Sequence, residues 1–563
     1  MQATASSTGH PRWIRIVLGI GCVAALAPLA WLDPGKRQMG LYFSWLAAMV
    51  LYLLQWKVPR GVVQWRPSRL LIATLIAYGL VLFVGFCAVY DNWRWAVTGD
   101  SLLFYGIGEE LARGNPAINW LGVRGVFEQA TVVQATLQSA FMNITVSLFT
   151  HRLGNLLTST LLVLAAAGFA AEASGATAGV LLGLFLPLNW VFAEFTLISL
   201  PNLSAVLPYY ALYALFLVAW RVWTSDFLWA ALGLTTGLAL YFAPLWFGAG
   251  LIVSAAVVAS AVYWRRLRIL GPWLGGILVA GLPGLLQLPT LLHVWFIFRP
   301  AMGLSIPYAL QIAWQIVCLP FKGEIDAPWI APPFGALVIA GIALALVSGL
   351  AALFQRARGR VLQSAWLWLV PLAADIGGLS LANSGYPAVS LKRAIVMLPC
   401  LSFLLVLPLA WLSERVGRAW LTASLAAAAL IPYAYLNAWE LQHHEFGFNI
   451  TDGLVRMAQT SPGRVLLLSA HPDLDSAFGP DPDPGGQADG RLLIQRMFHP
   501  RSHIVNNSVI PSRREDFDRV VCFSSHFDGP EWAAKVRGAM EGICPGKPVE
   551  QITGQLECVT CDP

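Results

Sequence analysis

The chain has 563 residues, of which 57% are hydrophobic and only 12% are charged. A soluble globular protein carries about a quarter charged residues, so this composition excludes an ordinary soluble protein. The net charge of +6 comes from arginines in short loops between apolar runs, and the polar C-terminal segment is acidic. We therefore expect a membrane protein without the basic face that nucleic-acid binding requires.

Apolar runs long enough to cross a bilayer recur along the chain up to residue 437. We expect an α-helical polytopic membrane domain over 1–437, with about thirteen transmembrane helices. The first run lacks a convincing small-residue cleavage site, so we interpret it as an uncleaved helix rather than a signal peptide. The weakest two runs are short and interrupted by Pro244. The expected spans are 16–32, 39–56, 70–90, 152–171, 174–192, 203–221, 226–241, 245–264, 272–290, 332–354, 363–381, 394–412 and 419–437.

Arginine and lysine clusters alternate with these spans in a way that sets their orientation. Cytoplasmic loops carry an excess of basic residues, and this rule puts the N-terminus in the cytoplasm. The loop 91–151 and the segment after residue 437 then lie outside. The clusters are Arg12 and Arg15, Lys57 to Arg69, Arg265 to Arg268, Arg356 to Arg360, and Arg415 with Arg418.

The first exterior loop, 91–151, is amphipathic rather than simply polar. Residues 101–113 and about 127–149 have helical spacing, and such helices lie in the plane of the membrane interface. Asp100 begins the first of them. The sequence therefore predicts a pair of interfacial helices in this loop, with an acidic residue at the lipid–water boundary.

The segment 438–563 is polar and has strand-like runs at 465–469, 503–509 and 519–523 between helical patterns. This alternation predicts a small exterior α/β domain. It contains Cys522, Cys544, Cys558 and Cys561. In an oxidising compartment they predict two disulfides, with three possible pairings. A redox or zinc pair at Cys558 and Cys561 is the alternative, whereas the other four cysteines are expected to be packing residues.

Four stretches of the membrane half resemble the GT-C superfamily of membrane glycosyltransferases, in its protein-mannosyltransferase and aminoarabinose-transferase branch. These stretches are Gly99-Asp100-Ser-Leu-Leu-Phe104-Tyr105, Phe141 to Gly154 with its Arg152-Leu153, Ala193-Glu194 to Asn202, and Lys392-Arg393 with Leu398-Pro399. The resemblance implies an enzyme of the bacterial inner membrane. Such an enzyme transfers a sugar from a polyprenyl-phosphate donor to a lipid, glycan or protein acceptor in the cell envelope, on the periplasmic side.

The resemblance also implies roles for individual residues. Asp100 would be the catalytic base that activates the acceptor, because an interfacial carboxylate can take its proton. Its alternative role is that of a helix N-cap. Arg152, Lys392 and Arg393 would contact the donor phosphate, although the last two could also be cations that snorkel at a helix end. Glu194 is either a second catalytic acid or an interfacial residue.

Two departures from the family pattern bear on cofactors. Ser101 follows Asp100 where the family often has a second acid, and Asn202 stands at the acidic position of the second exterior loop. These departures argue against a bound divalent metal, and the sequence indicates no other cofactor. The alternative functions are a transporter or flippase of a lipid-linked sugar, which would carry ionisable residues inside its spans, and a non-catalytic subunit for envelope assembly.

Overall fold

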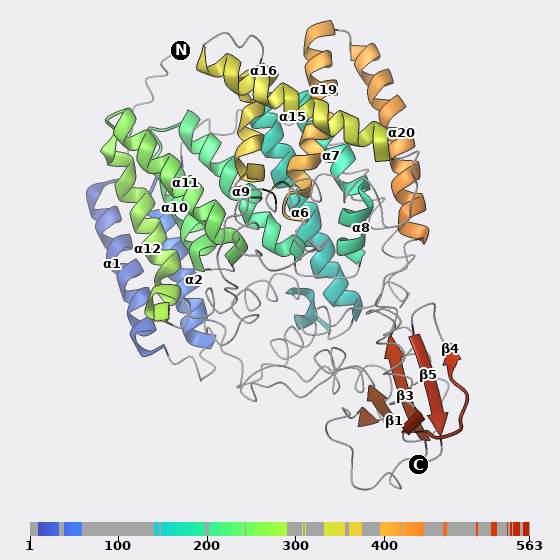
Figure 1. Cartoon of the computed structure of the whole chain (residues 1–563). Helices are drawn as coiled ribbons and strands as arrows, with labels where there is room; N and C mark the ends of the chain where they lie inside the picture. Colours follow the sequence, from blue (N-terminus) through green and yellow to red (C-terminus); the bar gives the residue numbers. More distant parts are fainter. Residues whose placement is uncertain are drawn as a thin grey trace.

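The computed structural model describes two parts of the chain, a helical part and a sheet (Figure 1). The helical part comprises 10–32, 39–58, 140–145, 148–197, 202–241, 244–289, 331–354, 360–373, 395–417 and 419–443. The sheet and its surroundings comprise 465–469, 503–504, 519–525, 544–551 and 556–561, and a few single residues are described between these ranges. Asp100, Lys392, Arg393 and most of the loop 91–151 lie outside the described residues.

Helices occupy the described apolar runs, and their bounds follow the expected spans closely. They are α1 (Arg12–Leu26), η1 (Ala27–Trp31), α2 (Met39–Leu54), η3 (Ala140–Asn143), α6 (Leu148–Ser174), α7 (Ala176–Leu188), α8 (Trp190–Leu197), α9 (Asn202–Arg221), α10 (Asp226–Tyr241), α11 (Pro244–Tyr263), η4 (Leu267–Ile269), α12 (Leu270–Leu286), α15 (Ala331–Leu353), α16 (Arg360–Ser364), η5 (Ala365–Trp368), α19 (Leu398–Val416) and α20 (Ala419–His443).

Two boundaries differ from expectation for identifiable reasons. Pro244 does not interrupt a span but opens α11, where its missing N–H costs nothing because the first turn has no intrahelical acceptor for it. The expected span 174–192 is broken instead, since α7 and α8 meet at an angle of 67°. Asn189, the residue between them, has an extended backbone.

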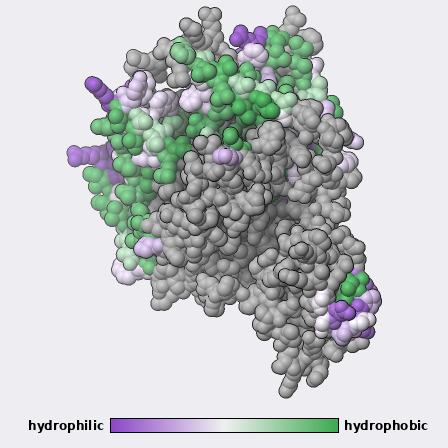
Figure 2. Space-filling model, viewed as in Figure 1, coloured by the Kyte–Doolittle hydropathy of each residue, from purple (hydrophilic) through white to green (hydrophobic). Residues whose placement is uncertain are grey.

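Within the described residues, five helices are long and apolar enough to cross a membrane, and the bent pair α7–α8 would be a sixth. Those five are Arg12–Trp31, Phe149–Ser174, Leu267–Leu286, Phe334–Ala351 and Leu398–Val416. Figure 2 shows that the described surface over the helices is largely hydrophobic, as a lipid-facing surface must be. The expected total of thirteen stays a prediction, because the span 70–90 lies outside the described residues.

The described basic loops lie together at one end of the helical bundle. Side chains at this end form two sets of contacts. The first set connects the ends of α1, α2, α9 and α12, and the second set connects α6, α16 and α19. These contacts are Arg15 over the Trp56 ring, Tyr52 Oη to the Pro272 carbonyl, Arg266 over the Trp223 ring, Arg268 to Asp226 at 2.9 Å, the Ser174 and Ser364 hydroxyls, and Val361 N–H to the Glu414 carboxylate. The described members of the basic clusters thus share one side of the bundle, whereas the compartment that this side faces stays a prediction.

Prolines lie inside several helices, and at two of them a neighbouring helix lies against the carbonyl that the proline leaves without its helical partner. Pro283 lies within α12 and has no N–H for the Val279 carbonyl four residues earlier. Trp45 of α2 donates its indole N–H to that carbonyl at 3.1 Å, and the Trp45 side chain is buried. The hydrogen bond that Pro283 removes from α12 is therefore replaced by a side chain of α2.

Pro408 in α19 leaves the Leu404 carbonyl without its helical partner in the same way. Gly341 of α15 packs directly against this carbonyl, and a Cβ at position 341 would overlap it. A glycine is therefore required there, because the two backbones approach too closely for any side chain. Close approach of small residues is a general means of packing helices in membranes.

Five strands form the described sheet, in the order β2-β1-β3-β5-β4. The strands β1 (Val465–Ser469), β2 (His503–Ile504) and β3 (Arg519–Ser525) lie at the predicted runs and pair in parallel, whereas β5 (Leu556–Cys561) runs antiparallel to β3 and to β4 (Glu550–Gln551). In Figure 1 the sheet lies outside the helical bundle. The division of the chain into 1–437 and 438–563 stays a prediction.

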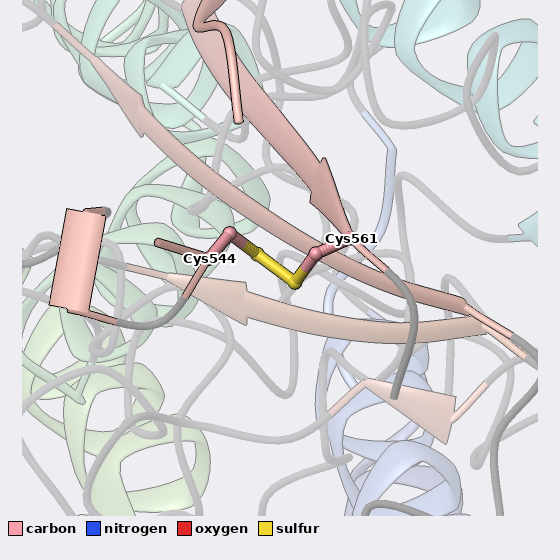
Figure 3. Close-up of a disulfide and its surroundings, with 2 residues drawn as sticks. All are labelled: Cys544 and Cys561. Carbon is pink, nitrogen blue, oxygen red and sulfur yellow. A yellow bond between two sulfur atoms is a disulfide. The ribbon is translucent and has the colours of Figure 1, made fainter. Parts of the chain in front are cut away.

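One of the two expected disulfides is present in the described residues and joins Cys544 to Cys561 (Figure 3). It ties the segment before β4 to the end of β5. Because Cys561 is bonded to Cys544, it does not form the alternative redox or zinc pair with Cys558. The side chains of Cys522 and Cys558 lie outside the described residues. Cys22 and Cys400 are buried and form no disulfide, as expected of packing residues.

We expect Trp45→Phe to destabilise the helical part by about 1 kcal/mol, the usual net value of one hydrogen bond, or somewhat more because the Val279 carbonyl is left buried and unpaired. Pro283→Ala restores a helical N–H to that carbonyl, so Trp45→Phe should cost less in the Pro283→Ala background. Thermal unfolding of the four proteins of this double-mutant cycle measures the difference. Trp13→Phe, at an exposed position of α1, is the control. Equal costs of Trp45→Phe in both backgrounds would contradict the replacement.

Non-reduced peptide mapping should recover a Cys544–Cys561 linked pair. These cysteines are separated by 17 positions in the sequence, and closing a loop of that size stabilises a folded domain by about 3 kcal/mol in the chain-entropy model. Cys22 and Cys400 should react with a thiol reagent after denaturation without reductant, whereas Cys544 and Cys561 should not. The remaining pair, Cys522 with Cys558, stays the prediction for the second disulfide. Free thiols at both Cys544 and Cys561 would contradict the disulfide between them.

Candidate functional site

The helix α8 is a short half-helix that carries Glu194. The preceding helix α7 contains Pro187, which cannot supply the N–H of a regular helix, and the chain turns by 67° before α8 begins. Glu194 is fully buried within the protein. Broken helices of this kind are tolerated at membrane depth only where other protein groups surround them, and they often mark binding sites.

The facing helix α6 presents a polar stripe near its start. Arg152, Asn155 and Ser159 recur at helical spacing on one face, and all three are buried. Asn155 donates its amide N–H groups to the carbonyls of Phe195 and Thr196 at 2.9 and 2.8 Å. A third link joins the hydroxyls of Thr196 and Ser159 at 3.1 Å. The stripe therefore binds α6 to α8 through specific hydrogen bonds.

Among the described residues, the buried side chains of the His, Lys, Arg, Asp and Glu types are all on these two helices. They are His151 and Arg152 on α6 and Glu194 on α8. Burying a charge is costly unless it is paired or hydrogen-bonded, so such a concentration in an otherwise apolar bundle needs a reason. Function is the ordinary reason for ionisable residues inside a membrane protein.

This polar contact lies at the end of the bundle opposite the basic loops. Arg152 is near the start of α6, whereas Ser174, the last residue of α6, bonds Ser364 at the basic end. At 1.5 Å per residue, Arg152 and Ser174 are roughly 33 Å apart along the helix. The same polarity applies to α19, which ends at the basic end, where the Glu414 carboxylate accepts from the Val361 N–H.

Of the five site residues expected from the sequence, the structure describes two. It places Arg152 and Glu194 on α6 and α8, two helices that hydrogen-bond to each other. Asp100, Lys392 and Arg393 lie outside the described residues, so their roles stay predictions. Glu194 is enclosed by protein, and both of its expected roles stay predictions.

Chemically, this arrangement combines a fixed cation, an acid and neutral polar groups in a region from which water is largely excluded. An arginine in such a place can hold a phosphate through its planar guanidinium group. Glu194 can bind a hydroxyl or accept its proton. In the parts of the chain that the structure describes, no three His, Cys, Asp or Glu side chains gather as metal ligands.

Sequence reasoning missed Asn155, although a signal for it exists. Asn155 follows Arg152 by three residues and precedes Ser159 by four, so these polar residues form one stripe on an apolar helix. Polar groups at that spacing in a membrane span indicate a buried polar face rather than a lipid-facing one.

Comparison by sequence finds no matching family model and no matching curated protein. Comparison by structure does find matches. The aminoarabinose transferase ArnT from Cupriavidus metallidurans, bound to undecaprenyl phosphate, is 14% identical to this chain, with a TM-score of 0.51 over 87% of this chain and 97% of that one.

Two further structures score lower. The apo form of the same ArnT gives a TM-score of 0.49 at 16% identity, covering 86% of this chain and 98% of that one. The Archaeoglobus fulgidus oligosaccharyltransferase, in complex with Zn and sulfate, gives 0.46 at 14% identity, covering 80% and 67%. Such scores lie below 0.5, where a likeness no longer establishes a common fold. The first likeness does establish one, so this chain shares its overall fold with that ArnT structure over most of its length.

Proposed function

We propose that the protein is a glycosyltransferase that moves a sugar from a polyprenyl-phosphate donor to an acceptor in the cell envelope. The observation that carries this proposal is the buried contact of α6 and α8, which brings Arg152 and Glu194 into an apolar bundle with a GT-C fold. The ArnT structure with the same fold contains undecaprenyl phosphate, which supports a donor of the polyprenyl-phosphate class.

The proposed reaction takes place at the end of the bundle that carries this contact. The acceptor hydroxyl or amine attacks the anomeric carbon of the donor sugar and transfers its proton to the carboxylate of Asp100. The bond between the anomeric carbon and the phosphate oxygen breaks, and polyprenyl phosphate leaves. Arg152, Lys392 and Arg393 stabilise the charge that develops on the departing phosphate, and Glu194 binds or orients the acceptor.

A transporter of a lipid-linked sugar is the second candidate, and a specific observation favours it. Transporters also place ionisable residues beside broken helices, as α7, α8 and Glu194 are placed here. The two functions differ in their products. Purified protein supplied with a polyprenyl-phosphate sugar and an envelope acceptor should release free polyprenyl phosphate if it is a transferase, whereas a transporter leaves the donor intact.

The proposed orientation puts the N-terminus in the cytoplasm of a bacterial inner membrane, with the loop 91–151 and the segment 438–563 in the periplasm. Fusions of a periplasm-active reporter after Gly114 and after Gly490 should therefore both be active, because basic loops stay in the cytoplasm. A fusion after Arg266, in a basic loop, should be inactive and serves as the control. A cytoplasmic signal at Gly114 or Gly490 would overturn this topology.

Asp100→Asn should remove sugar transfer, because an amide keeps the size and much of the capping ability of the side chain but cannot accept the proton. Loss of a general base typically lowers the rate on the order of a hundred- to ten-thousandfold. The melting temperature should stay near that of the wild type. Lys392→Ala and Arg393→Ala should instead raise the KM for the donor, since they remove phosphate contacts.

The control for Asp100→Asn is the melting curve of the same preparation. A strongly lowered melting temperature with intact activity per folded molecule would identify Asp100 as a helix cap. Near wild-type transfer by Asp100→Asn would exclude it as the base, and Glu194→Gln would then be the next variant to test.

A further inference from the structure

The two ends of α8 are held by side-chain amides from other helices. A helix leaves its first N–H groups and its last carbonyls without intrahelical partners. In an eight-residue helix such as α8, those groups make up most of the backbone. Because α8 lies among buried residues, protein side chains must satisfy them.

At the start of α8, the partner comes from α20. Asn437 accepts a hydrogen bond from the Trp190 backbone N–H at 2.8 Å, and its own amide N–H donates to the Tyr433 carbonyl at 2.7 Å. The second bond fixes which way the amide of Asn437 points. Asn437 is separated from Trp190 by 247 residues along the chain, so this contact is purely tertiary.

Asn189 completes this end. Its side-chain oxygen accepts from the Val191 backbone N–H at 3.1 Å, which is the ordinary N-cap arrangement. Its amide nitrogen donates to the Tyr433 hydroxyl at 2.9 Å. The Tyr433 ring packs against Phe185 and Phe334, with ring centroids 5.2 and 5.0 Å away. The start of α8 is therefore anchored to α20 by a closed set of hydrogen bonds.

At the end of α8, the partner comes from α6 and has the opposite polarity. Asn155 donates to the carbonyls of Phe195 and Thr196, which are among the last carbonyls of α8. Glu194 is adjacent to Phe195 in sequence, so this cap lies within one residue of it. The start of α8 thus needs acceptors, which Asn437 and Asn189 supply, and its end needs a donor, which Asn155 supplies.

We propose that Asn437 and Asn155 are positioning residues, which hold α8 by its two ends and thereby fix the place of Glu194 relative to Arg152. This rests on the proposed function only for the consequence in catalysis. Asn437 lies on α20, at the end of α8 away from Glu194, so it acts through the helix and not on the substrate. A supporting group that loses such contacts typically lowers activity on the order of ten- to a hundredfold.

The opposite polarity of the two caps gives a sharp test, because one chemical change has opposite effects at the two positions. Asn437→Asp keeps an oxygen that accepts from Trp190 N–H, and its negative charge is favourable at a helix N-terminus. It gives up the bond to the Tyr433 carbonyl, which lies within α20 and does not involve α8. Asn155→Asp removes the donor and puts negative charge beside the carbonyl end of α8. Asn437→Ala removes the acceptor without adding charge.

The experiment uses the full chain in lipid nanodiscs and measures amide hydrogen exchange of a peptide that covers 190–197. Exchange should rise on the order of tenfold or more in Asn437→Ala and Asn155→Asp, and stay near wild type in Asn437→Asp. If Asn437→Asp does not fold, Asn437→Ser replaces it as an acceptor. Thr236→Val is the matched control, since Thr236 is buried on α10 and bonds only within its own helix, to the Leu232 carbonyl.

Kinetics of sugar transfer supply the second readout. With a polyprenyl-phosphate sugar as donor, kcat of Asn437→Ala should fall on the order of ten- to a hundredfold with an unchanged donor KM, and Asn437→Asp should restore it. If Asn437→Asp and Asn155→Asp change the hydrogen exchange of 190–197 by the same factor, the proposal is overturned. A wild-type protein that transfers no sugar overturns the proposed function and the catalytic part of this inference, whereas unchanged exchange of 190–197 overturns the capping itself.

Discussion

The described helical part depends on one constraint, that every backbone N–H and carbonyl removed from water must find a partner inside the protein. A straight apolar helix meets this constraint by itself. The breaks and prolines of this chain do not, and in three described cases another helix supplies the missing group or packs closely over it. Trp45 serves α12, Gly341 covers the Leu404 carbonyl of α19, and Asn437 with Asn155 serves α8.

The same constraint explains why the candidate site lies where it does. A half-helix such as α8 exposes polar backbone that demands polar neighbours, and those neighbours make a region of the bundle where a glutamate and an arginine can also be buried. The irregular backbone and the ionisable side chains thus occur together for one physical reason. A bundle of uninterrupted helices with this composition would have no comparable place for Glu194.

The sequence predicted the helices well because a bilayer demands long apolar runs, and it predicted β1 and β3 because their runs are bounded by turn residues. It did not predict the break at Asn189, since the apolar run 174–192 is continuous and the stabilising contact comes from Asn437, far along the chain. Arg152 and Glu194 came from a family resemblance. Asn437 had no such signal, because its partner is a backbone N–H. The sequence analysis considers only the cysteines of 556–561 and predicts no strand there. The pairing of this segment with β3 identifies it as the strand β5.

The bond from Trp45 to Val279 also bears on biogenesis. A chain enters the membrane from its N-terminus, so α2 is inserted long before α12 is synthesised. When α12 arrives with Pro283, its orphaned carbonyl would face lipid at a cost of several kcal/mol. In the structure, the indole N–H of Trp45 donates a hydrogen bond to that carbonyl, which belongs to Val279. This bond joins the N-terminal helices to α12 within one packed bundle, so they are part of the helical core rather than an appended anchor.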